Sequence, residues 1–222
     1  MRVNYDDFAK TFATSRSQLK WPEISYILSQ LSMQDTIIDI ACGSWRLIQA
    51  FQEHFQVDPH GYYWIDASEK LLQEARKSHP WFTFSCWNME EWKSYEDIYS
   101  SFKNIKKNIF CIAWFHHIMN IDDRISTMKH WYNFLNIWER VFMINWALES
   151  PKNINTYKNS MIASSENQFW SHDFSIKIWK YYRWYHSFTL SELEYLANQT
   201  KFTIVENWLF VGEKNYITIL ER

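Results

Sequence analysis

A short stretch near residue 40 carries residue types that suit the binding of a small ligand. Asp39 closes the apolar run 36–38 and is followed by the small residues Ala41 and Gly43. Small residues let a ligand approach the backbone. Helical spacing begins at Arg46, so a helix N-terminus is expected directly after the turn. A helix N-terminus favours a negatively charged group. Such a strand–turn–helix is the first unit of a doubly wound sheet, where ligands bind outside the carboxyl ends of the strands.

This stretch resembles the first motif of the class I S-adenosylmethionine-dependent methyltransferases, acidic–x–Gly–x–Gly–x–Gly. The three glycine positions read Ala41, Gly43 and Trp45 in this chain. Alanine is a mild departure, but an indole at position 45 would project toward the cofactor. The resemblance implies S-adenosylmethionine as the cofactor. It assigns to cofactor binding the residues Asp39, Ala41, Cys42, Gly43 and Trp45.

Further cofactor contacts are expected after the next strands. Asp66 ends the second predicted strand, where an acidic residue can accept hydrogen bonds from both ribose hydroxyls, and Ala67 follows it. After the third strand, Asn88 stands where the family usually has an aspartate that contacts the adenine amine, and Met89 could pack on the adenine ring. The resemblance also places Ala113, at the end of the fourth strand, beside the cofactor.

The stretch 114–118 contains His116 and His117 and resembles the family's small–x–His–His–apolar signature, which an arginine follows. Adjacent histidines point to different sides, so a two-histidine metal site is not expected and no metal is predicted. Which of the two faces the site stays open. The residues that would contact or orient the methyl acceptor are His116, Arg124 and Arg16.

Two other stretches resemble a narrower group, the tRNA wobble-uridine carboxymethyl methyltransferases and their uncharacterised bacterial relatives. One runs from Tyr5 through Arg16 to Trp21-Pro22, and the other is Tyr185–Leu193. In the second, Thr189 and Glu192 predict a capping box at the start of the last helix. The resemblance implies tRNA modification at a carboxymethyl-uridine.

The elements that must position these residues alternate between strand and helix. The pattern predicts an α/β, doubly wound, Rossmann-like seven-stranded mostly parallel sheet with an antiparallel C-terminal hairpin. One domain, 1–222, is expected, with a helical cap over 1–32 and an insertion over 149–185, without clear periodicity, that forms a substrate lid. Predicted strands cover 36–38, 61–66, 82–86, 108–113, 140–148, 202–209 and 215–220, and a helix with Ser68 as N-cap covers 69–77.

Basic and aromatic side chains interleave in the lid, which suggests a second interpretation of that segment. Charge and stacking together could hold a nucleic-acid strand there, although a solvated lid with a few packed aromatics fits equally well. The interleaved residues are Lys177, Trp179, Lys180, Tyr181, Tyr182, Arg183 and Trp184.

The balance of glycine and tryptophan is unusual. The 222 residues include 3 glycines and 14 tryptophans, whereas ordinary usage predicts roughly 15 glycines. Several tryptophans also stand where the fold favours a residue without a side chain. We hypothesise that some are UGA codons read as glycine in the source organism. The positions concerned are Trp45, Trp64, Trp87, Trp138 and Trp208.

Composition otherwise indicates an ordinary globular chain, with 47% hydrophobic and 22% charged residues and a formal net charge of −2. No signal peptide or membrane span is predicted. Cys42, Cys86 and Cys111 lie beside or within predicted strands and fit a reduced, cytoplasmic protein better than a disulfide scaffold.

Three functions remain in competition on these residues: a tRNA methyltransferase, a methyltransferase for a small metabolite, and a catalytically degenerate methyltransferase fold kept as a binding module. A carboxylate acceptor needs no base, whereas a hydroxyl or amine would need His116 or His117 to take a proton. A dehydrogenase is disfavoured because the turn lacks G-x-G-x-x-G. The expected partners are the small-molecule cofactor and a tRNA. The sequence identifies no small activating subunit.

Overall fold

The computed structural model describes residues 5–16, 21–43, 46–59, 61–88, 102, 105–162, 168–178 and 180–222. The chain divides into two compact units. Of the described residues, those from Tyr5 to Cys111 form the N-terminal unit together with Phe134–Glu139, and Ile112–Asn133 with Arg140–Arg222 form the C-terminal unit.

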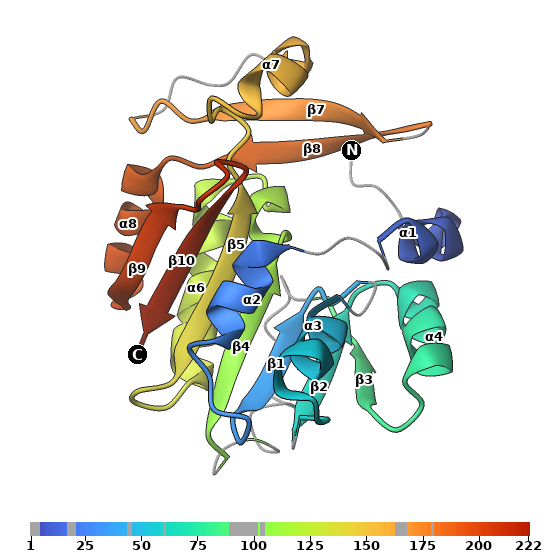
Figure 1. Cartoon of the computed structure of the whole chain (residues 1–222). Helices are drawn as coiled ribbons and strands as arrows, with labels where there is room; N and C mark the ends of the chain where they lie inside the picture. The colour runs from blue at the N-terminus through green and yellow to red at the C-terminus, as the bar shows by residue number, and fades with distance from the viewer. Residues whose placement is uncertain are drawn as a thin grey trace. The chain divides into compact units, whose positions relative to one another are not determined.

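A seven-stranded sheet has the strand order β3-β2-β1-β4-β5-β10-β9. β1 pairs in parallel with β2 and β4, and β2 pairs in parallel with β3, whereas β10 is antiparallel to both β5 and β9 (Figure 1). The strands are β1 Thr36–Ile40, β2 Tyr62–Asp66, β3 Thr83–Cys86, β4 Lys107–Ile112, β5 Arg140–Trp146, β9 Thr203–Leu209 and β10 Asn215–Glu221. The predicted Rossmann-like sheet with an antiparallel hairpin is therefore confirmed.

The helices of the N-terminal unit begin where the sequence signals indicate. Pro22 stands at the first turn of α2, and the Ser68 hydroxyl caps α4 by accepting the Leu71 N–H at 3.2 Å. Asp6 also lies at the start of α4, where its carboxylate accepts a hydrogen bond from the Ser68 hydroxyl at 2.6 Å. The elements are η1 Tyr5–Asp7, α1 Ala9–Arg16, α2 Pro22–Leu28, α3 Arg46–Phe55 and α4 Glu69–Ser78.

The C-terminal unit holds a second sheet that the sequence did not predict. The segment 149–185, in which the sequence shows no clear periodicity, contains the antiparallel strands β6 Met161–Ile162, β7 His172–Ile178 and the start of β8 Tyr181–Ser187. Figure 1 shows the long β7–β8 hairpin and, elsewhere in this unit, α8 beside β9. The remaining elements are η2 Phe115–His117, α6 Ile121–Phe134, α7 Ile154–Tyr157, η3 Lys158–Ser160 and α8 Leu190–Gln199.

One face of the β7–β8 hairpin is buried, which explains why the segment folds as a sheet. Phe174, Ile176 and Tyr185 form a buried cluster with Leu148, and alternation along each strand brings them to the same face. Arg183 lies in register with Ile176 and is itself buried, at 8% exposure. Because Arg183 is charged but faces inward, the alternation of apolar and polar residues that is typical of a strand is not visible in the sequence.

The tryptophans at expected glycine positions divide into two groups. Trp138 has φ +70° and is 73% exposed, so a bulky side chain is held in a conformation that favours glycine while its ring gains little contact. Trp64 is instead fully buried, and Trp208 donates its indole N–H to Glu206 at 3.0 Å. Trp87 is half-buried, and Trp45 lies outside the described residues. Trp170, which the sequence did not single out, resembles Trp138, with φ +57° and 83% exposure.

We predict that Trp138→Gly stabilises the chain by about 1 kcal/mol, because the left-handed conformation costs an L-residue roughly that much. Urea unfolding measures the change. Trp138→Ala is the matched control, since it keeps a Cβ at positive φ and should show no comparable gain. Trp208→Gly should destabilise, because glycine weakens a strand. A destabilised Trp138→Gly chain would contradict the argument.

Candidate functional site

Asp66, at the carboxyl end of β2, joins two turns of the N-terminal unit. Its Oδ2 accepts the Gly43 N–H at 2.9 Å, and its Oδ1 accepts the Ser68 N–H at 2.9 Å. Burial raises the pKa of this carboxyl, and the backbone N–H donors oppose that shift. The carboxylate is thus fixed between the turn after β1 and the start of α4, the place where a doubly wound sheet binds a ribose.

The turn after β1 has the backbone of a glycine-rich motif even where glycine is missing. Ala41 and Gly43 both have φ +53°. Phe12, from α1, lies over the turn: its Cε1 would be 3.6 Å from a Cβ at Gly43. That distance is ordinary van der Waals contact, so the left-handed backbone conformation, rather than a lack of space, favours glycine at position 43.

Asp39, in the carboxyl half of β1, is buried and accepts a hydrogen bond from the Tyr62 hydroxyl at 2.7 Å. Burial raises the pKa of Asp39 from 3.8 to about 7; the Tyr62 hydrogen bond and the charge of Arg46 lower it, and Asp66 raises it. Burial also raises the pKa of the neighbouring Cys42 thiol well above its usual value. Cys42 is therefore a neutral packing residue of the turn.

The raised Asp39 pKa predicts a pH dependence of stability. Between about pH 4 and pH 7 the folded state holds this proton more tightly than the unfolded chain, so the Asp39 contribution is full below about pH 4 and is lost as pH rises to about 7. Relative to Asp39→Asn, the wild type should lose up to about 1.4 kcal/mol per pH unit in urea unfolding across this window. Tyr62→Phe should extend the loss above pH 7. Parallel pH profiles for wild type and Asp39→Asn would contradict this.

The other predicted cofactor residues follow the parallel strands. Ala67 is exposed directly after Asp66, and Asn88 is half-buried two residues after β3. Ala113 follows β4 with φ +58° and donates its N–H to Ile144 at 2.8 Å. Met89 lies outside the described residues, as does the side chain of Arg16, the last residue of α1.

His116 lies in η2 and is 1% exposed. Its Nδ1 accepts the Trp146 N–H at 3.4 Å, and its Nε2 makes no hydrogen bond of normal geometry to a described residue, although the Asn145 side chain lies close enough to oppose the lowering of the His116 pKa. Burial holds the pKa of His116 well below 6.5, and the charge of His117 acts in the same direction. The ring is therefore neutral, and with Nδ1 accepting, its proton is on Nε2.

His117, the next residue, has a different role. Its Nδ1 donates to the Trp184 carbonyl at 2.8 Å, so its Nε2 accepts a hydrogen bond from the Arg183 guanidinium. Burial lowers the pKa of His117 to about 4, against the opposing Trp184 hydrogen bond. Both nitrogens of His117 are engaged by β8, which leaves His116 as the histidine with a donor to offer a ligand.

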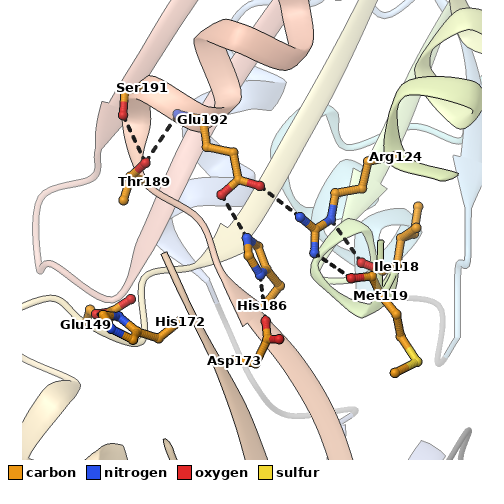
Figure 2. A network of polar contacts seen from close by, with 10 residues as sticks. All are labelled: Ile118, Met119, Arg124, Glu149, His172, Asp173, His186, Thr189, Ser191 and Glu192. Atoms are coloured by element: carbon orange, nitrogen blue, oxygen red, sulfur yellow. Dashed lines mark hydrogen bonds and ion pairs between the residues drawn. The ribbon is translucent and has the colours of Figure 1, made fainter. Parts of the chain in front are cut away.

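Arg124, predicted to contact the acceptor, directs its nitrogens to protein groups (Figure 2). Nη1 donates to Glu192 at 2.8 Å, Nε to the Ile118 carbonyl at 2.9 Å and Nη2 to the Met119 carbonyl at 3.2 Å. The predicted capping box is only half correct. Thr189 accepts the Glu192 N–H at 3.2 Å, but the Glu192 carboxylate turns inward to Arg124 and His186, because a buried cation is a stronger partner than a helix-start N–H.

Sequence reasoning missed two of the residues that shape this region. Arg183 was interpreted as a nucleic-acid contact, but it is buried against His117 and the Tyr185 ring, with its guanidinium carbon 5.1 Å from the ring centroid. His186 was included only as part of a motif. The pairing of Arg183 with Ile176 could have revealed an inward position, had the strand been recognised. Of the other proposed nucleic-acid contacts, Lys177, Lys180 and Tyr182 are exposed, Tyr181 and Trp184 are half-buried, and Trp179 lies outside the described residues.

Within the described residues, no group of three or more histidine, cysteine, aspartate or glutamate side chains is arranged to hold a metal ion. Over the same residues, no helix is both long and apolar enough to cross a membrane. The three cysteines, all within the described ranges, form no disulfide.

Comparison with known proteins identifies the fold. No protein-family model matches the chain, and no curated protein matches its sequence. Several solved methyltransferase structures match it over nearly their whole length. An S-adenosylmethionine-dependent methyltransferase from Clostridium acetobutylicum is 14% identical, with 98% of each chain covered and a TM-score of 0.63.

Two further methyltransferase structures match the chain with similarly low identity and similarly high coverage. A SAM-dependent methyltransferase from Methanosarcina mazei is 16% identical, covering 91% of this chain and 98% of that one, with a TM-score of 0.61. The 1,6-didemethyltoxoflavin-N1-methyltransferase of Burkholderia thailandensis, solved with its substrate and S-adenosylhomocysteine, is 12% identical, covering 100% and 91%, with a TM-score of 0.61. The chain therefore has the fold of the S-adenosylmethionine-dependent methyltransferases.

Proposed function

We propose that this chain is an S-adenosylmethionine-dependent methyltransferase. The observation that carries the proposal is the Asp66 carboxylate, held between the Gly43 and Ser68 N–H groups at the carboxyl end of β2. A carboxyl acceptor at that point of a methyltransferase fold suits the two ribose hydroxyls. The left-handed turn at Ala41 and Gly43 admits the rest of the cofactor close to the backbone.

For the methyl acceptor, we propose a carboxylate. Methyl transfer from a sulfonium is an in-line displacement, and a carboxylate is already ionised at neutral pH, so it needs no base. The neutral His116 ring carries its proton on Nε2, where it is a hydrogen-bond donor rather than a proton acceptor. Such a group orients an anionic acceptor, whereas a hydroxyl or amine would require the opposite tautomer.

The carboxylate could belong to a tRNA or to a small metabolite. The resemblance of the Tyr5–Arg16 and Tyr185–Leu193 stretches to tRNA wobble-uridine carboxymethyl methyltransferases supports tRNA. The burial of Arg183, which removes one cation from the expected nucleic-acid surface, favours a small metabolite. The neighbour from Burkholderia thailandensis that acts on 1,6-didemethyltoxoflavin is an example of that second class on this fold.

The deciding experiment incubates the chain with S-adenosylmethionine carrying a tritiated methyl group and either purified tRNA or a panel of small carboxylic acids. Label that enters one acceptor class identifies it, and release of the label by mild alkali shows a methyl ester. Alkali-stable label would contradict the carboxylate. A folded chain that binds the cofactor and labels nothing would favour the binding-module alternative.

We further propose that the chain is one methyltransferase domain, acting in the cytoplasm, in which 149–185 is a lid over the acceptor. The β6-β7-β8 sheet and its buried cluster give that segment a structure of its own, as a lid needs. The reduced state of all three cysteines is consistent with a reducing compartment.

We also propose that some of the tryptophans are glycines in the protein made by the source organism. The positive φ of the exposed Trp138 and Trp170 supports this, whereas the indole hydrogen bond of Trp208 suits a genuine tryptophan. Peptide mass spectrometry of protein from the source organism tests it directly. Tryptophan at 45 and 138 would contradict the proposal.

A further inference from the structure

A chain of four ionisable side chains runs through the C-terminal unit. Arg124 on α6 donates to Glu192 on α8 at 2.8 Å, Glu192 pairs with His186 on β8 at 2.8 Å, and His186 pairs with Asp173 on β7 at 2.7 Å (Figure 2). The side chains of Arg124, Glu192 and His186 are at most 5% exposed, whereas that of Asp173 is 26% exposed.

Glu192 is the centre of this chain of contacts. One ring nitrogen of His186 faces Asp173 and the other faces Glu192, and Glu192 also accepts from Arg124. Burial raises the pKa of Glu192, but its His186 and Arg124 partners outweigh burial and lower it, so Glu192 is ionised. Removing one member of a buried network leaves the others without full compensation.

The inner end of this network holds the turn that carries the two histidines. Arg124 donates to the carbonyls of Ile118 and Met119, the two residues that directly follow η2. β8, which supplies His186, also holds the ring of His117 through the Trp184 carbonyl and Arg183. Two elements therefore hold the turn that carries His116 and His117. Arg124 on α6 binds the residues that follow the turn, and β8 binds the His117 ring. Glu192 connects α6 to β8 because it pairs with both Arg124 and His186.

We propose that Glu192, acting with Arg124 and His186, is a positioning residue that sets the His116–His117 turn for methyl transfer. The effect on methyl transfer rests on the proposed function, because it requires that the chain is a methyltransferase. The structural part of the inference, that the charge of Glu192 controls the environment of His117, stands independently. Displacement of a reacting group by about 1 Å is enough to lower a rate about 100-fold.

The test is Glu192→Gln, which keeps the size of the side chain but removes its charge. We expect kcat for methyl transfer to fall about 100-fold, while the Kd for S-adenosylmethionine changes less than about twofold, because the proposed cofactor residues Asp66 and Gly43 belong to the N-terminal unit. Nitrogen-15 NMR of the histidine rings gives a second readout. The His117 Nδ1–H, bonded to Trp184, should exchange faster with water in the variant.

Two matched variants separate positioning from general stability. Thr189→Ala removes the cap that accepts the Glu192 N–H but leaves the carboxylate, so it should lower the melting temperature without changing kcat or the His117 proton. Glu74→Gln breaks the exposed Lys77–Glu74 pair on α4, which lies outside both the network and the proposed lid, and it should change neither. If Glu192→Gln does not fold, Asp173→Asn weakens the same network from its more exposed end and should lower kcat a few-fold.

Two results would overturn the proposal: Glu192→Gln with wild-type kcat and wild-type His117 exchange, or Thr189→Ala with the same kcat loss as Glu192→Gln. If the chain has no methyltransferase activity, the proposed function fails, but the His117 exchange still decides the positioning claim. Faster exchange in Glu192→Gln alone would support it, and equal exchange in all variants would contradict it.

Discussion

Asp66→Ala should weaken the binding of S-adenosylmethionine about 100-fold. The Asp66 carboxylate is the group that we expect to accept both ribose hydroxyls, and a hydrogen bond to a charged group contributes about 1.5–3 kcal/mol. The same substitution also frees the N–H groups of Gly43 and Ser68, which loosens the two turns that form the cofactor site. Isothermal titration calorimetry measures the change in Kd.

The matched control for this prediction is Asp58→Ala. Asp58 is an exposed aspartate of the same unit that accepts a hydrogen bond from Gln52 and lies near His79, so its removal changes the net charge equally and should leave the Kd unaltered. Circular dichroism must show both variants folded. An Asp66→Ala chain that binds the cofactor as tightly as the wild type would show that this carboxylate is not the ribose ligand.

Glu139→Ala should destabilise the chain by about 3–5 kcal/mol, the cost of leaving a buried charge without its partner. Lys107 and Glu139 form an ion pair at 3.0 Å with side chains 1% and 4% exposed, and the Lys107 ammonium lies 5.0 Å from the centroid of the Phe134 ring. Glu139 also accepts the N–H groups of Lys107 and Asn136 at 3.0 and 2.6 Å. Urea unfolding measures the loss.

Two variants test the origin of that loss. Lys107→Met combined with Glu139→Gln keeps an acceptor for the backbone N–H groups and removes both charges, so it should be more stable than Glu139→Ala. Glu74→Ala breaks the exposed Lys77–Glu74 pair and should cost less than about 1 kcal/mol. Equal losses from Glu74→Ala and Glu139→Ala would contradict the role of burial.

The sequence predicted the fold well because its signals are local. An apolar run that ends at Asp39 or Asp66, a Pro22 at a helix start and a Ser68 cap each specify their own element, and the structure has β1, β2, α2 and α4 at those places. The β7–β8 hairpin was missed because its inward face includes Arg183, so a simple alternation of apolar and polar residues was not visible.

The candidate site could be predicted only in part, for a related reason. The position of Asp66 follows from the end of a strand, and strand ends are visible in the sequence. Arg124 and Glu192 lie on different helices, α6 and α8. Their ion pair therefore depends on how the two helices pack, which no local sequence pattern encodes. Short motifs therefore drew attention to Arg124 and Glu192, but only the structure shows that the two side chains pair with each other.

Binding of S-adenosylmethionine, measured by isothermal titration calorimetry, tests the central claim most directly. Two chains should be compared: the sequence as written, and a version with glycine at positions 45, 87 and 138 that keeps the fully buried Trp64. The account predicts one-to-one binding by the glycine version at least, and binding by both would mean that the tryptophans are tolerated. If both versions are folded and neither binds the cofactor, the methyltransferase assignment is contradicted.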